Sequence, residues 1–425
     1  MIRHSVRQDR RIGAAGLLAA LAMLAAIDLQ PAAGRAATAE AVLWSLKGTP
    51  QGSDPVGELV ADPKHANVYY GITEKGGVGG NGTVFKLTHQ HGGWSGTVLY
   101  SFTGGKDGWH PEGSLAIDSK GALYGAAIGG GSAGMGAVFE LNPPAGPKGS
   151  WSVTTLHSFT GGTDGAFPES GVVFDASGNL YGTTDWGGDA HGNGTVYMLT
   201  PKAGAKADFD YQIIHRFTGN DGQEPVAPLT VGDGVLYGTT FSGGVKECNS
   251  QCGVVFTLEP SGGGWRYSII HTFTGAATEG ANPVAALLIG SDGALYGTAS
   301  TGGTNCGGDG CGTVFSLQRN GGQWRIKGLH HFAGTDGAAP IAGLVMYRGN
   351  LYGTTSKGGS GSNGTLFELT ASGANWHFAT LHDFGSSPDG ANPAGGLIPD
   401  GDGHLLGTTE AGGKSGNGTV FLYTP

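Results

Sequence analysis

Residues 178–200, GNLYGTTDWGGDAHGNGTVYMLT, decide the fold of this chain. A glycine-rich loop separates two runs of β-branched and aromatic residues, 180–184 and 195–199, and such runs predict strands. The tyrosine–glycine pair in the first run recurs along the chain at steps of 54 to 59 residues. The seven copies of the pair begin at Tyr70, Tyr124, Tyr181, Tyr237, Tyr296, Tyr352 and, with leucine in place of tyrosine, Leu406.

Each copy contains four short strand-like runs. In the third copy these are residues 171–174, 180–184, 195–199 and 211–217, and turns rich in Gly, Asn, Asp and Ser lie between them. Four-stranded sheets repeated radially form a β-propeller. No long stretch beyond the N-terminal segment has a 3.6-residue apolar period, so we expect few helices. The sequence therefore predicts an all-β fold, a seven-bladed β-propeller of four-stranded blades.

The two ends of the repeat array predict how the ring closes. Residues 42–46 align with the fourth strand of the unit, and residues 418–423 align with the third. The last blade therefore lacks an outer strand and the N-terminus carries a spare one. Pairing the two closes the ring and hides edges that an open sheet would leave exposed.

Composition excludes two classes of protein. Gly (85) and Pro (19) make up about a quarter of the 425 residues, a proportion at which disorder is normally considered. However, 38% of the residues are hydrophobic, with 8 Trp, 13 Tyr and 17 Phe, so the chain can bury a core. The net charge of −10 and the lack of a basic patch argue against a nucleic-acid partner.

The N-terminus predicts export. Four arginines lie among the first eleven residues, an apolar run follows at 12–27, and Ala37-Thr38-Ala39 is a cleavage-site pattern. The run is shorter than the roughly 20 residues of a spanning helix, which favours a cleaved signal peptide over a retained anchor. We expect a signal peptide at 1–39, a propeller at 40–425, and a secreted or periplasmic monomer with no membrane span after cleavage. The Arg10-Arg11 pair leaves the general secretory and twin-arginine routes both open.

The units resemble the bacterial tandem repeat called GloVer. The residues that carry the resemblance are GxLYGTTxxGG, GxGTVFxL and a Trp-led fourth strand, and they cover residues 42–425. The resemblance implies a secreted protein and supplies no catalytic residues. GloVer proteins carry alternative C-terminal anchors, whereas this chain stops at Pro425 after the last strand, so we expect a released or periplasmic protein. The layout is also kelch-like in architecture, which does not give a function.

The glycine-rich loops do not predict a nucleotide site. Residues 77–82 match G-x-G-x-x-G, but the loop opens a strand, whereas a dinucleotide site needs a helix N-terminus. We interpret the Asn-Gly pairs as hairpin turns that require positive φ. No cofactor is predicted. The pairs, which also form N-G-T glycosylation sequons, begin at Asn81, Asn193, Asn363 and Asn417.

Four cysteines lie in two of the loops, Cys248 and Cys252 in one and Cys306 and Cys311 in the other. In an exported chain, an even count at close spacing favours disulfides, and we favour two intraloop bridges over pairing between neighbouring blades. A zinc site is the alternative, but the spacings are not the usual C-x2-C.

A histidine recurs two places before the Phe that ends the fourth strand. Because the fourth strand forms the outer rim of a propeller, equivalent histidines diverge and cannot share one ion. We predict packed, hydrogen-bonded residues between blades and no metal site. These histidines are His157, His215, His271, His330 and His382, with Tyr100 and Trp44 in the remaining units.

The loop after the fourth strand carries an Asp or Glu and a Pro in almost every copy, as in Asp164 and Pro168. Since strands alternate in direction, this loop and the glycine-rich loop lie on one face, where propellers commonly bind ligands. Asp-Gly and Pro can also simply fix the turn. A functional site should break the seven-fold symmetry. The residues that do so are Glu112 and Glu169, which follow the proline where other copies have Val, Ile or Ala, together with Trp109, His110, Asp185, Trp186, Asp189, His191 and Glu224.

Two functions fit these residues. The first is a non-enzymatic binding or scaffold module that recognises a glycan or an envelope protein. The partner would bind on the face that carries the glycine-rich loops and the loops after the fourth strands. The second is a polysaccharide-acting enzyme with Glu112 and Glu169 as its carboxyl pair, since paired carboxylates beside aromatic rings suit sugar chemistry. A quinoprotein or copper oxidase is a weaker third hypothesis, because no cofactor constellation is visible. The interpretation without a function is that these acidic residues are simply scattered over the surface.

Overall fold

The computed structural model describes residues 40–425, apart from 147, 203–207, 245–251, 277, 304–305, 307–309, 374 and 386. The chain divides into two units, Met1–Ala39 and Glu40–Pro425, and the predicted signal peptide lies outside the described residues. The described part of the second unit contains strands and no helix, which confirms the all-β prediction. Nothing in it therefore resembles a long apolar helix that could cross a membrane.

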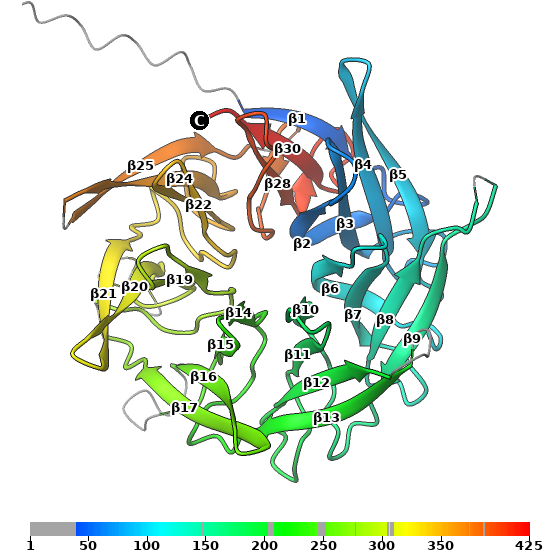
Figure 1. The fold of residues 1–425 in the computed structure, drawn as a ribbon. Coiled ribbons are helices and arrows are strands. Elements are labelled where there is room, and N and C mark those ends of the chain that lie inside the picture. Colours follow the sequence, from blue (N-terminus) through cyan, green and yellow to red (C-terminus); the bar gives the residue numbers. More distant parts are fainter. Residues whose placement is uncertain are drawn as a thin grey trace, which may run out of the picture. The chain divides into compact units, whose positions relative to one another are not determined.

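Seven four-stranded antiparallel sheets form the blades of a β-propeller, and Figure 1 shows them arranged in a ring. In six blades the strands follow one another in chain order from the channel to the rim. Blades 1 to 3 consist of β2 (Ser53–Ala61), β3 (Val68–Lys75), β4 (Thr83–Gln90) and β5 (Gly93–Ser101); β6 (Trp109–Ile117), β7 (Leu123–Gly129), β8 (Ala137–Asn142) and β9 (Ser152–Ser158); and β10 (Val173–Phe174), β11 (Leu180–Thr184), β12 (Thr195–Pro201) and β13 (Phe209–Arg216).

The next three blades have the same order. The inner strand is short from blade 3 onward, so β10 covers only part of the run predicted at 171–174. Blades 4 to 6 consist of β14 (Thr230–Gly232), β15 (Val235–Thr239), β16 (Val254–Ser261) and β17 (Gly264–Thr272); β18 (Leu288–Ile289), β19 (Leu295–Ala299), β20 (Thr313–Asn320) and β21 (Gln323–His331); and β22 (Val345–Tyr347), β23 (Asn350–Thr355), β24 (Thr365–Ser372) and β25 (Asn375–Asp383).

Blade 7 closes the ring with both ends of the chain, as predicted. Its strand order is β27 (Ile398–Pro399), β28 (Leu405–Thr409), β30 (Thr419–Tyr423) and β1 (Glu40–Ser45), so the N-terminal strand is the outer one. The antiparallel register pairs Glu40 with Tyr423 and Ser45 with Thr419. A separate two-stranded ribbon of β26 (Gly390–Ala391) and β29 (Ala411–Gly412) lies beside this blade.

The tyrosine–glycine pair has a packing reason that the sequence did not reveal. In blade 4, a Cβ atom on Gly238 would lie 2.4 Å from Cζ of the buried Phe256 ring on the neighbouring strand. The tip of the ring on each third strand thus contacts the glycine of the second strand, and no larger residue fits. The seven glycine–ring pairs are Gly71–Phe85, Gly125–Phe139, Gly182–Tyr197, Gly238–Phe256, Gly297–Phe315, Gly353–Phe367 and Gly407–Phe421.

We expect Gly238→Ala to lower the free energy of unfolding by about 2 kcal/mol, since the added methyl overpacks a fully buried ring. Gly264→Ala in the same blade is the matched control, because its Cβ would come no closer than 3.9 Å to another heavy atom. Urea denaturation of both variants measures the difference. Equal stability of the two would show that the Phe256 ring does not require this glycine.

The Asn-Gly pairs do not form the hairpin turns that the sequence predicted. Instead, they contact the prolines of the loops between blades. Gly194 has a φ of +89°, but Asn193 does not have a positive φ, as a type I′ turn would require. A Cβ atom on Gly194 would lie 2.6 Å from Cδ of Pro225 in the next blade. The carbonyl of Asn193 accepts the N–H of Glu224, which precedes that proline. The pair therefore joins neighbouring blades.

The aspartates of the loops after the fourth strands stabilise the turns in which they lie, and the repeated histidines contact these aspartates. In blade 3, Asp221 accepts the N–H of Thr218 at 2.7 Å, and Nε2 of His215 lies 3.1 Å from its carboxylate. The His215 ring also stacks on Tyr267 of blade 4, with 3.9 Å between the ring centroids. This confirms the prediction of packed histidines between blades. The other histidine–carboxylate pairs, at 2.9 to 3.3 Å, are His157–Asp164, His271–Glu279, His330–Asp336 and His382–Asp389.

One of the two predicted intraloop disulfides is present between Cys306 and Cys311, whose Cα atoms are 5.6 Å apart. Cys252 is also disulfide-bonded. Cys248, its predicted partner, lies outside the described residues.

Candidate functional site

The residue that follows each loop proline lines the central channel. Seven equivalent positions, one per blade, face a cavity of about 300 Å³. Five of them are apolar, and the two exceptions, Glu112 and Glu169, lie on adjacent blades and face the same cavity. The structure thus brings together the two carboxyls that the sequence singled out. The ring of positions is Val56, Glu112, Glu169, Val226, Val284, Ile341 and Ala394.

Further carboxylates gather on the same side of the channel. Glu58 of blade 1 and Glu410 of blade 7 line the cavity as well. The corresponding positions of blades 5 and 6 carry neutral residues such as Ser300 and Ser356. Among the described residues that line the cavity, the carboxylates therefore lie on the neighbouring blades 7, 1, 2 and 3. We name this set the acidic sector, and it consists of Asp54, Glu58, Glu74, Glu112, Glu169, Asp185, Glu224 and Glu410.

The two carboxyls that break the symmetry of the channel ring have raised pKa values. Burial, followed by the charges of Glu169, Glu74 and Glu410, raises the pKa of Glu112 to about 8, and Lys75 offsets this only in part. Burial and the charges of Asp185 and Glu224 raise the pKa of Glu169 to about 7. Desolvation and like charge both disfavour the ionised form. At neutral pH, much of the pair is therefore protonated and can donate as well as accept hydrogen bonds.

Sequence reasoning missed Glu58 and Glu410. The Glu58 side chain is exposed to the channel, but protein surrounds its carboxyl group. The resulting desolvation raises the pKa of this carboxyl to about 7. Burial and the charges of Asp54 and Glu74 also raise the pKa of Glu410. An alignment of the position after the second strand would have found Glu410, because Asp185 occupies it in blade 3.

A second depression lies beside the channel where blades 3 and 4 meet. Asp185, Trp186, His191 and Glu224 line it, with a volume of about 290 Å³. Trp186 is 54% exposed and its ring is parallel to that of Phe167, with 6.4 Å between the centroids. Burial and the charge of Glu224 raise the pKa of Asp185 to about 6. Trp186 thus does not share the cavity of Glu112 and Glu169, but the acids beside it act on Glu169.

The remaining predicted residues have local roles. The ring of Trp109 lies against the backbone of Gly129, where a Cβ atom would come within 2.0 Å of it. Nδ1 of His110 lies 3.3 Å from Glu74, so His110 is a partner of the acidic sector. The carboxylate of Asp189 accepts the N–H of His191 at 2.7 Å and shapes its own loop.

Among the described residues, Lys75 is the lysine that pairs with the acidic sector. Nζ of Lys75 lies 2.9 Å from Asp54 and 3.5 Å from Glu74, and it faces one side of the sector. Among the described residues, the sector does not bring three ligating atoms within 4.8 Å of one another, so a preformed metal centre is not seen there. The arrangement suits a ligand that brings hydroxyl or ammonium groups.

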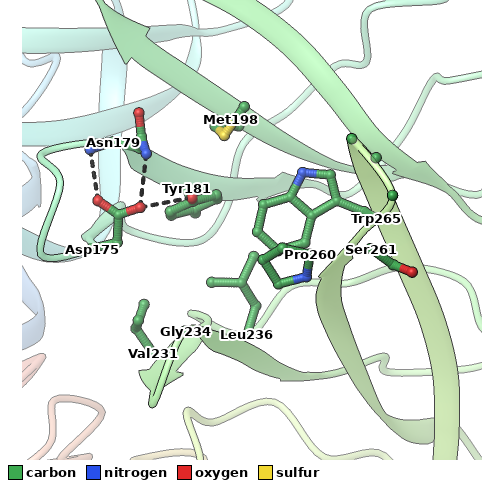
Figure 2. Close-up of a pocket in the computed structure, with 13 residues that line it drawn as sticks. Asp175, Asn179, Tyr181, Met198, Val231, Gly234, Leu236, Pro260, Ser261 and Trp265 are labelled. Carbon is green, nitrogen blue, oxygen red and sulfur yellow. Dashed lines mark hydrogen bonds between the residues drawn. The ribbon is translucent and has the colours of Figure 1, made fainter.

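A larger cavity of about 490 Å³ lies where blades 3 and 4 meet, and the repeat itself explains its lining. Figure 2 shows Asp175 bonded to Asn179 and Tyr181 on one side and Trp265 on the other. The Tyr181 and Trp265 rings pack edge-to-face at 5.7 Å. The aromatic contact in this cavity belongs to the repeat, since it recurs as Tyr70–Trp151 and Tyr296–Trp376.

Comparison with protein families identifies the repeat. The model of the Gloeobacter/Verrucomicrobia repeat family matches residues 28–249 and 246–425, so the chain belongs to this family. The resemblance to the GloVer repeat is thereby confirmed. No curated protein matches the chain.

Solved structures share the fold at low sequence identity. A protein from Bacteroides uniformis, provisionally named 6-phosphogluconolactonase, is 14% identical, with a TM-score of 0.51 over 80% of this chain and 86% of that chain. A Thermus thermophilus protein provisionally named an oxidoreductase (glucose dehydrogenase) is 16% identical, with a TM-score of 0.42 over 91% and 99%. A Dyadobacter fermentans protein of unknown function is 9% identical, with a TM-score of 0.45 over 90% and 96%. At these identities the likeness concerns the fold alone.

Proposed function

We propose that this chain is an exported binding module that holds a glycan over the mouth of its central channel. The observation that carries the proposal is the broken symmetry of the channel ring, where Glu112 and Glu169 replace the apolar residues of five other blades. A fold needs no carboxyl at a position where Val, Ile and Ala serve in the other blades. Burying carboxyls together costs stability, and such costs are typical of functional sites.

The chemistry of the acidic sector fits a sugar. Glu112 and Glu169, with their raised pKa values, can donate hydrogen bonds to a hydroxyl or accept them from it. Trp186 provides an exposed ring at the margin, and an aromatic face packs well against a sugar ring. An ammonium group would further relieve the like charges of the sector, so we expect amino sugars to bind better than neutral sugars.

The second candidate function is a polysaccharide-acting enzyme. The observation that favours it is that Glu112 and Glu169 lie on adjacent blades and face one cavity, as a carboxyl pair for glycoside cleavage would. However, glycosidases separate the two pKa values so that one carboxyl is ionised while the other is protonated. Here the pKa values of both carboxyls are raised, to about 8 and about 7, which favours binding over cleavage.

Export and the monomeric state remain proposals. They rest on the arginine-rich and apolar N-terminus and on the ring closure, in which β1 covers the edge of β30 in blade 7. The partner we propose is therefore an extracellular or periplasmic glycan, with an envelope protein as the other outcome of a binding screen.

A glycan array read beside a reducing-sugar assay separates the two functions. We expect wild type to bind amino-sugar oligomers without releasing reducing ends, and Glu112→Gln/Glu169→Gln to bind at least tenfold more weakly. Asp210→Asn is the control, because Asp210 lies on the exposed outer strand β13 and 74% of its side chain is exposed. Turnover by wild type that disappears in the double variant would favour the enzyme. Binding that the double variant retains would exclude the acidic sector as the site.

A further inference from the structure

The place where blades 6 and 7 meet has an exceptional residue at one position. In blades 3, 4 and 6, the fourth-strand residue that pairs with the third-strand leucine is aromatic and packs on the histidine of the preceding blade, as Tyr211, paired with Leu199, does on His157. In blade 7 the position equivalent to Leu199 is Tyr423, and its partner is Glu40. A carboxylate thus lies where three blades have a ring and the other three have Gly, Val or Ile. The stacked pairs are His157–Tyr211, His215–Tyr267 and His330–Phe378, with centroids 3.6 to 3.9 Å apart.

This exchange creates a cluster of three ligating side chains. One potential ligand atom from each of Glu40, His382 and Asp389 lies within 4.8 Å of the other two. Nε2 of His382 is 3.1 Å from Oδ2 of Asp389. Oε1 of Glu40 is fully covered by protein and has no hydrogen-bond partner. A buried carboxylate oxygen without a donor is costly, and a bound cation would satisfy it.

A cavity of about 460 Å³ adjoins the cluster, with Lys47 and Lys414 on its wall. The cavity gives an ion access, and the lysines provide competing positive charge.

We propose that Glu40, His382 and Asp389 bind a divalent cation of the Zn²⁺ type where the N-terminal strand closes the ring. Imidazole together with carboxylates suits Zn²⁺, and three protein ligands leave a fourth position for water from the cavity. The ion joins β1 to β25 and to the loop that follows it, so it fastens the end of the chain to blade 6. The sequence predicted no metal site at the repeated histidines, and this proposal departs from that prediction at His382.

The other blades provide an internal control for this site. His215 and Asp221 form the same pair at 3.1 Å, but Tyr267 occupies the third position. Replacing Glu40 by tyrosine would therefore restore the ordinary contact between blades. That variant should fold without an ion and keep His382 and Asp389 in place.

The test measures Zn²⁺ in the full chain after dialysis, by elemental analysis and by titration calorimetry. We expect one ion per chain and a rise in Tm of about 2 °C or more at saturation. Glu40→Gln should bind at least tenfold more weakly, and Glu40→Tyr should bind none while remaining folded. Lys47→Met/Lys414→Met should bind at least as tightly as wild type.

Three results would overturn the proposal. The first is a wild type that retains no Zn²⁺ at micromolar concentration, and the second is binding by the two Glu40 variants that is as tight as that of wild type. Ca²⁺ binding without Zn²⁺ binding would contradict the assigned ion class. Because Glu40→Tyr follows the pattern of blades 3 and 4, loss of binding in that variant cannot be attributed to unfolding if its Tm is unchanged.

Discussion

A chain without residues 40–45 is expected to lose its cooperative fold and to aggregate. These residues form β1, the outer strand of blade 7, and their removal exposes the full edge of β30. Trp44 also packs on Phe85 of blade 1, with 5.2 Å between the ring centroids, in a cluster that includes the buried Leu406 and Val420. Loss of one such aromatic costs about 3 kcal/mol or more, and a domain has only about 5–15 kcal/mol in total.

A circular permutant tests whether strand pairing, rather than the length of the chain, is responsible. In it, a short turn links Pro425 to Glu40, and new ends lie between Gly262 and Gly263, where a Cβ atom would meet nothing within 4 Å. We expect this permutant to melt within a few degrees of wild type in calorimetry. If the truncated chain melts like wild type, β1 is not needed to close the ring.

The double variant Glu112→Gln/Glu169→Gln is expected to be more stable than wild type by about 3 kcal/mol at pH 9 and equally stable at pH 4. In wild type, the pKa values of the two carboxyls rise from 4.5 to about 8 and about 7 on folding. Each unit of pKa difference corresponds to about 1.4 kcal/mol, and screening by channel water reduces the sum.

The sign follows from proton linkage. Because both pKa values are raised in the folded state, that state retains protons which the unfolded chain has lost above pH 4.5. The contribution of this pair to stability is therefore complete below about pH 4.5 and is lost as the pH rises through 7 and 8. Glutamine does not titrate, so the double variant should not show this loss.

Denaturant unfolding from pH 4 to pH 9 measures the effect, with Asp210→Asn as the exposed control. A constant difference between wild type and the double variant over this range would contradict the raised pKa values. A gain in stability together with a loss of glycan binding is the pattern expected of a site kept for function at the expense of stability.

The fold could be predicted because the seven-fold repeat multiplies every local signal. The strands, the blade order and the closure by residues 42–46 all follow from the alignment of the copies, and the structure confirms them. The reason for the tyrosine–glycine pair could not be predicted, since it depends on a ring from another strand, as with Gly238 and Phe256. The interpretation of Asn193-Gly194 was wrong for a similar reason, because the contact that decides it comes from Pro225 of the next blade.

The candidate site could be predicted only in part. Comparison of the copies identified Glu112 and Glu169 as exceptions, and the structure places them at one cavity. The comparison of the copies could not show that Glu58 lies with these two carboxyls, because that requires knowing which residues face the channel. Nor could it place Trp186 in a separate depression. The third ligand of the proposed cation site, Glu40, is visible only once its pairing with Tyr423 is known.

The most direct test of the proposed binding site is amide hydrogen exchange with and without a saturating glucosamine oligomer. We predict protection in peptides that cover residues 107–113, 164–170 and 185–194, which lie at the channel mouth and its margin. Exchange at the outer strand β17 should not change. Protection confined to the outer strands, or to the cavity around Trp265, would contradict the account.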